Sequence, residues 1–219
     1  MKYNKYIVGF FTGFVKLTGI IPAWLLFKPS VKLEDGAKRG LKSPCIMVSN
    51  HTSLLDFVLY LIVFPFRTIH FLMAEVLFSK NAFLRVFLLL LGGIKVDRDS
   101  KNFDFVSDAL EVLDNKGTVG IFPQGRLPIN SKPFPFTVST AFIATHTDAP
   151  IVPVYTHGNY GIFKRAKVVI GKPIYLSDYR KEGLTDDEQL NYLTQVLEEK
   201  VYSLKDLLDK DGKNADSKQ

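Results

Sequence analysis

The stretch PCIMVSNHTSLLDFVLYLIV, residues 44–63, contains the pattern that decides the fold. Its first residues are mostly apolar and extended in character, which is typical of a buried β-strand. After a short polar loop the apolar residues continue, and they favour a helix that begins near Ser53. A buried strand followed directly by a helix is the repeating unit of α/β proteins, so this stretch predicts that fold class.

The same alternation continues along the chain. Strand-like runs occupy residues 44–49, 69–73, 93–97, 118–122, 151–155 and 167–171. Helical patterns occupy residues 53–64, 75–91, 101–116, 137–147 and 186–208. We therefore expect a single α/β domain over residues 43–208, with a largely parallel or mixed sheet flanked by helices. Residues 209–219 are polar and predict a disordered tail.

The N-terminal end is the most apolar part of the chain. Residues 6–27 carry one charge and are long enough to cross a bilayer. Small and polar residues nevertheless share one helical face: Lys5, Gly9, Thr12, Lys16 and Gly19. Together with a kink expected at Pro22, this favours a helix lying in the membrane interface over a straight span or a buried soluble helix. We expect residues 1–42 to form an apolar, basic, membrane-binding helical segment followed by a turn-rich link.

Positive charge gathers at the same end of the chain. The 219 residues carry a net charge of +6, and residues 1–42 contain eight Lys and Arg against two acidic residues. Residues 177–219 contain seven against eleven. Basic residues among Phe, Ile and Leu indicate an anionic membrane surface, because nucleic-acid-binding segments combine basic residues with polar neighbours. Membrane lipids are therefore expected partners, and nucleic acid is not.

His51 and Asp56 are spaced for acid–base chemistry. His51 follows a predicted strand, and Asp56 falls in the first turn of the next helix, from where its carboxylate can fold back. A carboxylate on one imidazole nitrogen fixes the tautomer and leaves the other nitrogen free to accept a proton from a hydroxyl. The pair is the base-and-orienter half of a catalytic triad without a serine nucleophile of its own, so a substrate hydroxyl is the expected nucleophile. The alternative is that Asp56 only caps the helix and His51 is incidental.

Further polar residues follow other predicted strands. GGIKVDR, residues 92–98, ends in Arg98, and IFPQGRLP, residues 121–128, contains Gly125 and Arg126. The ends of parallel strands meet at one edge of a sheet, which is the usual place for a site. Two arginines there could bind a phosphate through charge-assisted hydrogen bonds, although a surface salt bridge is the alternative for each.

Taken in order, four blocks resemble the motifs of the glycerolipid acyltransferase family, the lysophosphatidic acid acyltransferases, over roughly residues 40–175. NHTSLLD is similar to the first motif, which implies that His51 and Asp56 are the catalytic pair. GGIKVDR is similar to the second, which implies that Arg98 binds the phosphate of the acceptor. FPQGRLP and VPVY are similar to the third and fourth, and this implies four more substrate-binding residues: Gln124, Gly125, Arg126 and Pro153.

The third block departs from the usual F-P-E-G-T-R-S of that family. Gln124 stands in place of Glu, Arg126 in place of Thr and Leu127 in place of Arg, and Pro128 replaces the following Ser. The guanidinium therefore comes one residue early. The change leaves the catalytic pair intact, so it bears on the acceptor, which is either lysophosphatidic acid in a shifted pose or a related molecule.

The resemblance implies a membrane-associated enzyme of phospholipid biosynthesis at the cytoplasmic face. It would move a fatty acyl group from acyl-CoA or acyl-carrier protein to a hydroxyl of a lysophospholipid, with 1-acylglycerol-3-phosphate as the expected acceptor. No metal or organic cofactor is expected, because the thioester already activates the acyl group. A non-catalytic lipid-binding protein of the same fold and an acyl thioesterase are the alternatives.

Overall fold

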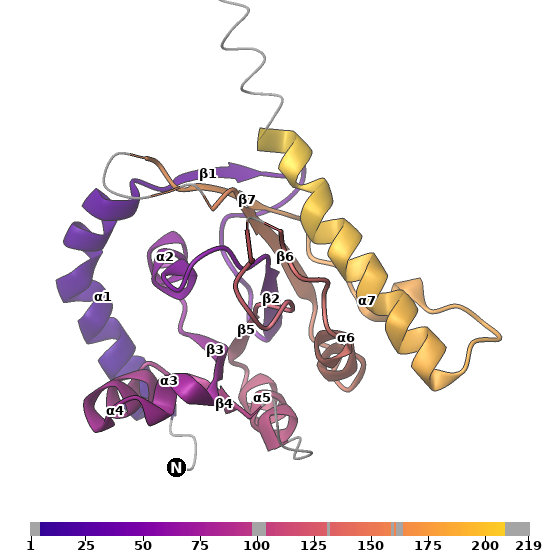
Figure 1. The fold of residues 1–219 in the computed structure, drawn as a ribbon, viewed down its shortest axis with the longest axis horizontal. Helices are drawn as coiled ribbons and strands as arrows, with labels where there is room; N and C mark the ends of the chain where they lie inside the picture. Colours follow the sequence, from indigo (N-terminus) through magenta and orange to yellow (C-terminus); the bar gives the residue numbers. More distant parts are fainter. Residues whose placement is uncertain (1–4, 98–103, 131, 159, 161–163, 209–219) are drawn as a thin grey trace, which may run out of the picture.

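The computed structural model describes residues 5–97, 104–130, 132–158, 160 and 164–208. Within them, seven strands form one sheet in the order β1-β7-β6-β2-β5-β3-β4 (Figure 1). The strands are Ser30–Leu33 (β1), Cys45–Ser49 (β2), Ile69–Ala74 (β3), Ile94–Val96 (β4), Thr118–Ile121 (β5), Ile151–Thr156 (β6) and Lys167–Ile170 (β7). Neighbouring strands are parallel except β6 and β7. The predicted α/β fold with a mixed sheet is therefore confirmed.

Helices cover both faces of the sheet, which Figure 1 shows nearly edge-on. One face carries α1 (Lys5–Phe27), α2 (Asp56–Val63), α3 (Glu75–Ser79) and α4 (Ala82–Leu90). The other carries α5 (Asp104–Asp114), α6 (Val138–Thr145), α7 (Asp186–Ser203) and a 3₁₀ turn, Leu176–Tyr179. Successive residues of β2 point to opposite faces of the sheet. Because helices cover both faces, every residue of β2 is buried. That explains why the strand reads as a continuous apolar run.

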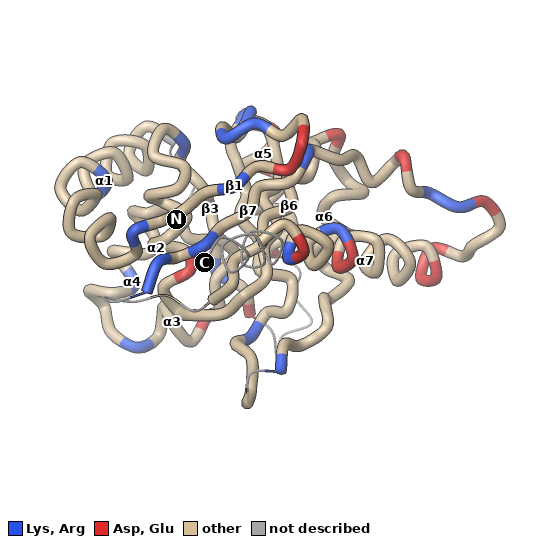
Figure 2. The backbone as a smooth tube through the Cα atoms, turned by 90° about the horizontal axis from the view of Figure 1, so that it is seen from above, with Lys and Arg blue, Asp and Glu red and all other residues tan. Residues whose placement is uncertain are grey.

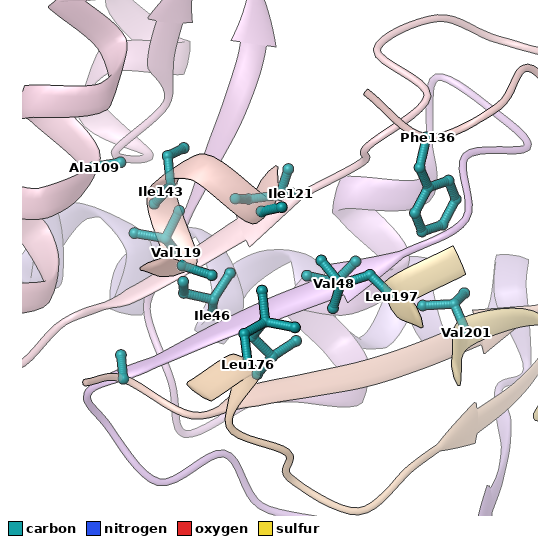
Figure 3. Close-up of a cluster of buried hydrophobic side chains, with 14 of the residues drawn as sticks. Ile46, Val48, Ala109, Val119, Ile121, Phe136, Ile143, Leu176, Leu197 and Val201 are labelled. Atoms are coloured by element: carbon teal, nitrogen blue, oxygen red, sulfur yellow. The ribbon is translucent and has the colours of Figure 1, made fainter. Parts of the chain in front are cut away.

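Each face has its own apolar core. Cys45 and Met47 of β2 pack under α1–α4, whereas Ile46 and Val48 pack under α5–α7. Figure 3 shows the second core, where Val48 lies beside Leu197 of α7. These two cores hold the central strands rigidly, and the loops that leave them carry the polar residues considered below.

Two elements differ from the sequence-based expectations. The expected turn-rich link contains β1, which pairs with β7 along its whole length. It is a four-residue edge strand that is only partly buried, so it lacks the apolar signature of a strand. The single helix expected over residues 75–91 is divided into α3 and α4, because the Asn81 side chain accepts a hydrogen bond from the backbone N–H of Leu84 and starts a new helix.

The N-terminal helix packs with its small and polar face toward the protein. Thr12 is only 1% exposed. Lys16 donates from Nζ to the carbonyl oxygens of Phe64 and Pro65, at 3.0 and 3.1 Å, and to that of Arg67. The large apolar side chains point outward, with Phe10 78% and Leu17 79% exposed. By length and composition, Tyr6–Phe27 could also cross a membrane.

Charge is unevenly distributed around the fold. Figure 2 shows acidic residues gathered along α7 and the loop before it, while α1 is almost free of charge. The capping box of α7, formed by Thr185 and Glu188, and two further acidic residues occupy its first turn. The apolar surface of α1 therefore lies away from the most acidic part of the molecule.

Candidate active site

The candidate site lies where the sheet topology reverses direction. The chain leaves β2 toward α2 on one face, and leaves the neighbouring strand β5 toward α6 on the opposite face. Two loops that diverge from adjacent parallel strands open a crevice at their carboxyl ends. His51 lies in the loop after β2, and Gln124 to Arg126 lie in the loop after β5.

The loop after β2 is fixed from both sides. Asn50 is buried, and its side-chain amide donates to the backbone oxygen of Thr156 and accepts from the N–H of the same residue, both at 2.8 Å. Ser49 forms a hydrogen bond with the hydroxyl of Tyr60 on α2. These bonds tie the end of β2 to α2 and to β6 just before the chain reaches His51.

His51 and Asp56 form a hydrogen-bonded pair. Nδ1 of His51 lies 2.8 Å from Oδ2 of Asp56, and the Asp56 side chain is fully buried while that of His51 is 17% exposed. The carboxylate also accepts bonds from the backbone N–H groups of Thr52 and Ser53, at 2.7 and 2.9 Å, and from the hydroxyl of Thr52 at 2.9 Å. An ionised carboxylate fits this setting of donors, and it fixes His51 with the proton on Nδ1.

Two tyrosines adjoin the buried carboxylate. Tyr160, in the connection between β6 and β7, donates its phenolic proton to Oδ1 of Asp56. Burial, and then the nearby negative charge of Asp56, raise the pKa of Tyr160 above its ordinary value. The same two causes raise the pKa of the fully buried Tyr60. Both phenols are therefore neutral at physiological pH, and Tyr160 acts as a hydrogen-bond donor.

The loop after β5 supports His51 from the other side. The His51 ring stacks on Phe122, with ring centroids 4.4 Å apart and planes 19° apart. The backbone N–H of His51 donates to Oε1 of Gln124 at 2.9 Å, and Nε2 of Gln124 donates to the hydroxyl of Tyr202 on α7 at 3.1 Å. Gln124 is buried. Its single side-chain amide therefore connects the β5 loop both to the His51 loop and to α7.

Two pockets flank the loop after β5. One, of about 280 Å³, is lined by His51, Arg126 and mainly apolar side chains that include Leu54, Phe57, Phe71 and Leu77. The other, of about 370 Å³, lies on the far side of the β5 loop and adds the polar side chains of Asp97, Thr137 and Ser139. Arg126 lines both pockets, and its guanidinium lies 4.9 Å from the ring centroid of Phe134. An apolar chain and an anionic group could thus be bound on either side of the same arginine.

Comparison with known proteins agrees with this geometry. The family model described as Acyltransferase matches residues 29–157, more than half of the chain. The chain belongs to the acyltransferase family. A Bacillus subtilis 1-acyl-sn-glycerol-3-phosphate acyltransferase is 26% identical over 84% of this chain and 93% of the relative. The yeast enzyme of the same name is 30% identical over 78% of this chain and 59% of its own length.

The fold of this acyltransferase is similar to that of a solved protein. The 1-acyl-sn-glycerophosphate acyltransferase PlsC of Thermotoga maritima superposes with a TM-score of 0.62, at 23% identity, over 93% of this chain and 80% of that one. At this identity the likeness concerns the fold. The sequence-based resemblance to glycerolipid acyltransferases is confirmed by the family match.

The structure brings most of the predicted site residues of this acyltransferase together. His51, Asp56, Gln124 and Arg126 meet at the crevice. Gly125 lines both pockets, and its N–H donates to the oxygen of Phe122 at 2.9 Å to close a β-turn. That N–H is therefore engaged within the turn. The substrate-binding roles of these residues stay predictions.

One predicted residue among those that the structure describes is not brought to the crevice. Pro153 lies inside β6 and lines neither pocket; its carbonyl oxygen accepts from Gly171 at 2.8 Å. Arg98, predicted to bind phosphate, lies outside the described residues. No sequence pattern pointed to Tyr160 or Tyr202 as functional residues. Tyr160 lies in a loop 104 residues from Asp56, and Tyr202 belongs to an amphipathic helix that resembles ordinary core packing.

Proposed function

We propose that this acyltransferase transfers a fatty acyl group from acyl-CoA or acyl-carrier protein to the free hydroxyl of 1-acylglycerol-3-phosphate, a step of phospholipid synthesis. The observation that carries the proposal is the His51–Asp56 pair beside an apolar pocket. The relatives named above, which are 1-acyl-sn-glycerol-3-phosphate acyltransferases, support this choice of acceptor.

The reaction follows from the tautomer of His51. Because Nδ1 donates to Asp56, Nε2 has a free lone pair and accepts the proton of the acceptor hydroxyl. The hydroxyl oxygen attacks the thioester carbonyl, and the buried carboxylate stabilises the imidazolium that forms. When the tetrahedral intermediate collapses, the carbon–sulfur bond breaks and the thiolate recovers a proton from the imidazolium. The ester and the free thiol carrier are the products.

The two pockets divide the substrates by their chemistry. The pocket with Leu54, Phe57 and Leu77 suits an acyl chain, because its lining is mainly apolar. Arg126 suits the phosphate of the acceptor, because a guanidinium can bind two phosphate oxygens at once. In this account Arg126 replaces the arginine that family members carry one residue later.

We also propose that α1 lies in the membrane interface at the cytoplasmic face, with Phe10, Phe14 and Leu17 in the lipid. These side chains are exposed in the structure, and so are Phe83 and Val86 on the neighbouring helix α4. An acyl acceptor that resides in the bilayer could then reach the site without leaving the membrane surface.

A test of acceptor and donor uses purified protein in lipid vesicles with labelled acyl-CoA or acyl-carrier protein. Lysophosphatidic acid should be acylated, and release of free fatty acid without an acceptor should be much slower. Arg126→Thr should raise the KM for lysophosphatidic acid by at least tenfold, because a charged contact to phosphate contributes about 1.5–3 kcal/mol. Lys132→Thr, which changes a basic residue outside both pockets, is the control. Rapid release of fatty acid with no acylation would favour a thioesterase instead.

A further inference from the structure

The Asp56 carboxylate accepts a hydrogen bond from Tyr160 in addition to the one from His51. We propose that Tyr160 is a positioning residue of the catalytic pair, and that Phe27 at the end of α1 holds Tyr160 in place. This inference rests on the proposed function and goes beyond it, because it connects the N-terminal helix to the reacting histidine.

The two oxygens of Asp56 have different partners. Oδ2 accepts from His51 and from the backbone N–H groups of Thr52 and Ser53. Oδ1 accepts from the hydroxyls of Thr52 and Tyr160. The phenol draws negative charge toward Oδ1 and resists rotation of the carboxylate. Tyr160 therefore sets both the direction and the strength with which Oδ2 accepts from His51.

Tyr160 is held in place from the N-terminal helix. Phe27, the last residue of α1, is 1% exposed, and its ring meets that of Tyr160 edge-on with centroids 5.4 Å apart. The carbonyl oxygen of Phe27 accepts from the N–H of Ala166, and Ser30 of β1 donates to the oxygen of Ala166, both at 2.8 Å. The end of α1 and the start of β1 thus hold Ala166, which lies at the other end of the same connection between β6 and β7.

Gly158, which lies between β6 and Tyr160, packs closely against the loop that carries His51. Gly158 has φ of +74°, and a Cβ atom there would lie 2.6 Å from Cβ of Thr52. Gly158 is therefore packed directly on Thr52 of the catalytic loop. Tyr160 lines neither of the two pockets described above, and its hydroxyl contacts Asp56.

Removing the Tyr160 hydroxyl should change the pH dependence of the reaction in a definite direction. The titratable groups that face Asp56 are His51, Tyr60 on α2 and Tyr160. Without the Tyr160 hydroxyl, more of the carboxylate charge stays on Oδ2, and it stabilises the imidazolium more strongly. We therefore expect proton abstraction by His51 to weaken most in mildly acidic solution.

The test compares Tyr160→Phe with wild type in vesicles, using lysophosphatidic acid and acyl-CoA over pH 5.5–9. The acid limb of the kcat profile should move to higher pH by roughly half a unit or more. The loss of kcat should therefore be several-fold larger at pH 6 than at pH 8, with both KM values unchanged. Tyr175→Phe, at a half-exposed tyrosine outside the pockets beside His51, is the matched control and should match wild type. A merely structural role would lower activity equally at every pH.

Phe27→Leu gives a second measurement that keeps the hydroxyl. It should produce a smaller shift in the same direction, and the double variant should resemble Tyr160→Phe alone, because Phe27 acts through Tyr160. Additive effects of the two substitutions would overturn this inference but not the proposed function. The same holds for an unchanged pH profile in Tyr160→Phe when the wild-type protein is active. Wild-type protein that transfers no acyl group would overturn the proposed function as well. If Tyr160→Phe does not fold, the shift in Phe27→Leu decides the matter.

Discussion

Gln124 occupies the position where glycerolipid acyltransferases usually have glutamate, and its contacts explain why the change is tolerated. Its Oε1 accepts from the backbone of His51, which a glutamate oxygen could also do. Its Nε2 donates to Tyr202, whose hydroxyl could instead donate to a glutamate. Since either side chain can hold the catalytic loop, we expect glutamine to replace glutamate here without displacing His51.

Gln124→Glu should accordingly retain activity within a few-fold, whereas Gln124→Leu should lose at least tenfold in kcat. The leucine leaves the partly buried N–H of His51 without an acceptor, which costs about 1–3 kcal/mol and frees the loop. Steady-state kinetics and urea unfolding of both variants check this. Equal activity of the leucine and glutamate variants would show that Gln124 does not position His51.

At the residue scale, sequence patterns predicted contacts between residues that lie close together along the chain. His51 and Asp56 are five residues apart across one strand–helix junction, so their pairing follows from local geometry. The contacts of Asp56 with Tyr160 and of Gln124 with Tyr202 join residues 104 and 78 apart. No periodicity specifies such contacts, because they depend on how separate loops and a distant helix pack around the crevice.

At the scale of elements, α1 is fixed by a partly buried cation. Lys16 lies against carbonyl oxygens at and just beyond the end of α2, where a positive charge also complements the helix dipole. The sequence pattern correctly placed this lysine on one face with Thr12. It did not reveal that this face contacts the protein, because a polar helix face more commonly contacts water.

Burial lowers the pKa of Lys16 from 10.5 to about 8 in the folded protein. The unfolded chain therefore binds more protons than the folded chain between pH 8 and 10.5, and Lys16 makes the free energy of unfolding rise with pH in that window. Lys16→Met lacks this dependence. Urea unfolding at pH 7.5 and 9.5 should show wild type gaining stability relative to Lys16→Met at the higher pH. A constant difference would contradict the assigned burial of the ammonium.

The exposed face of α1 gives a test of membrane binding. Replacing Phe10, Phe14 and Leu17 with serine should reduce partition into vesicles by at least a hundredfold, because each large apolar side chain contributes about 1.5–3 kcal/mol on burial. Flotation with liposomes measures the partition. Leu184→Ser, which changes a partly exposed leucine before α7, is the control. Undiminished flotation of the triple variant would exclude α1 as the anchor.

At the scale of the whole molecule, alternating strands and helices predicted the α/β sheet, because buried parallel strands carry a continuous apolar signal. Six of its strands were found in this way. The strand order was not predicted, since neighbours such as β2 and β6 are about a hundred residues apart. β1 was missed because a short edge strand needs few apolar residues. It ties the N-terminal segment into the same sheet as the catalytic loop.

The central claim is that His51, oriented by Asp56, is the base that activates the acceptor hydroxyl. It is tested most directly by measuring the acylation of lysophosphatidic acid from labelled acyl-CoA by His51→Ala and Asp56→Asn, with His146→Ala as the control outside the crevice. The account predicts that His51→Ala loses roughly 10²–10⁴ in kcat while remaining folded, that Asp56→Asn is severely impaired, and that His146→Ala resembles wild type. Near-full turnover by folded His51→Ala would contradict the account.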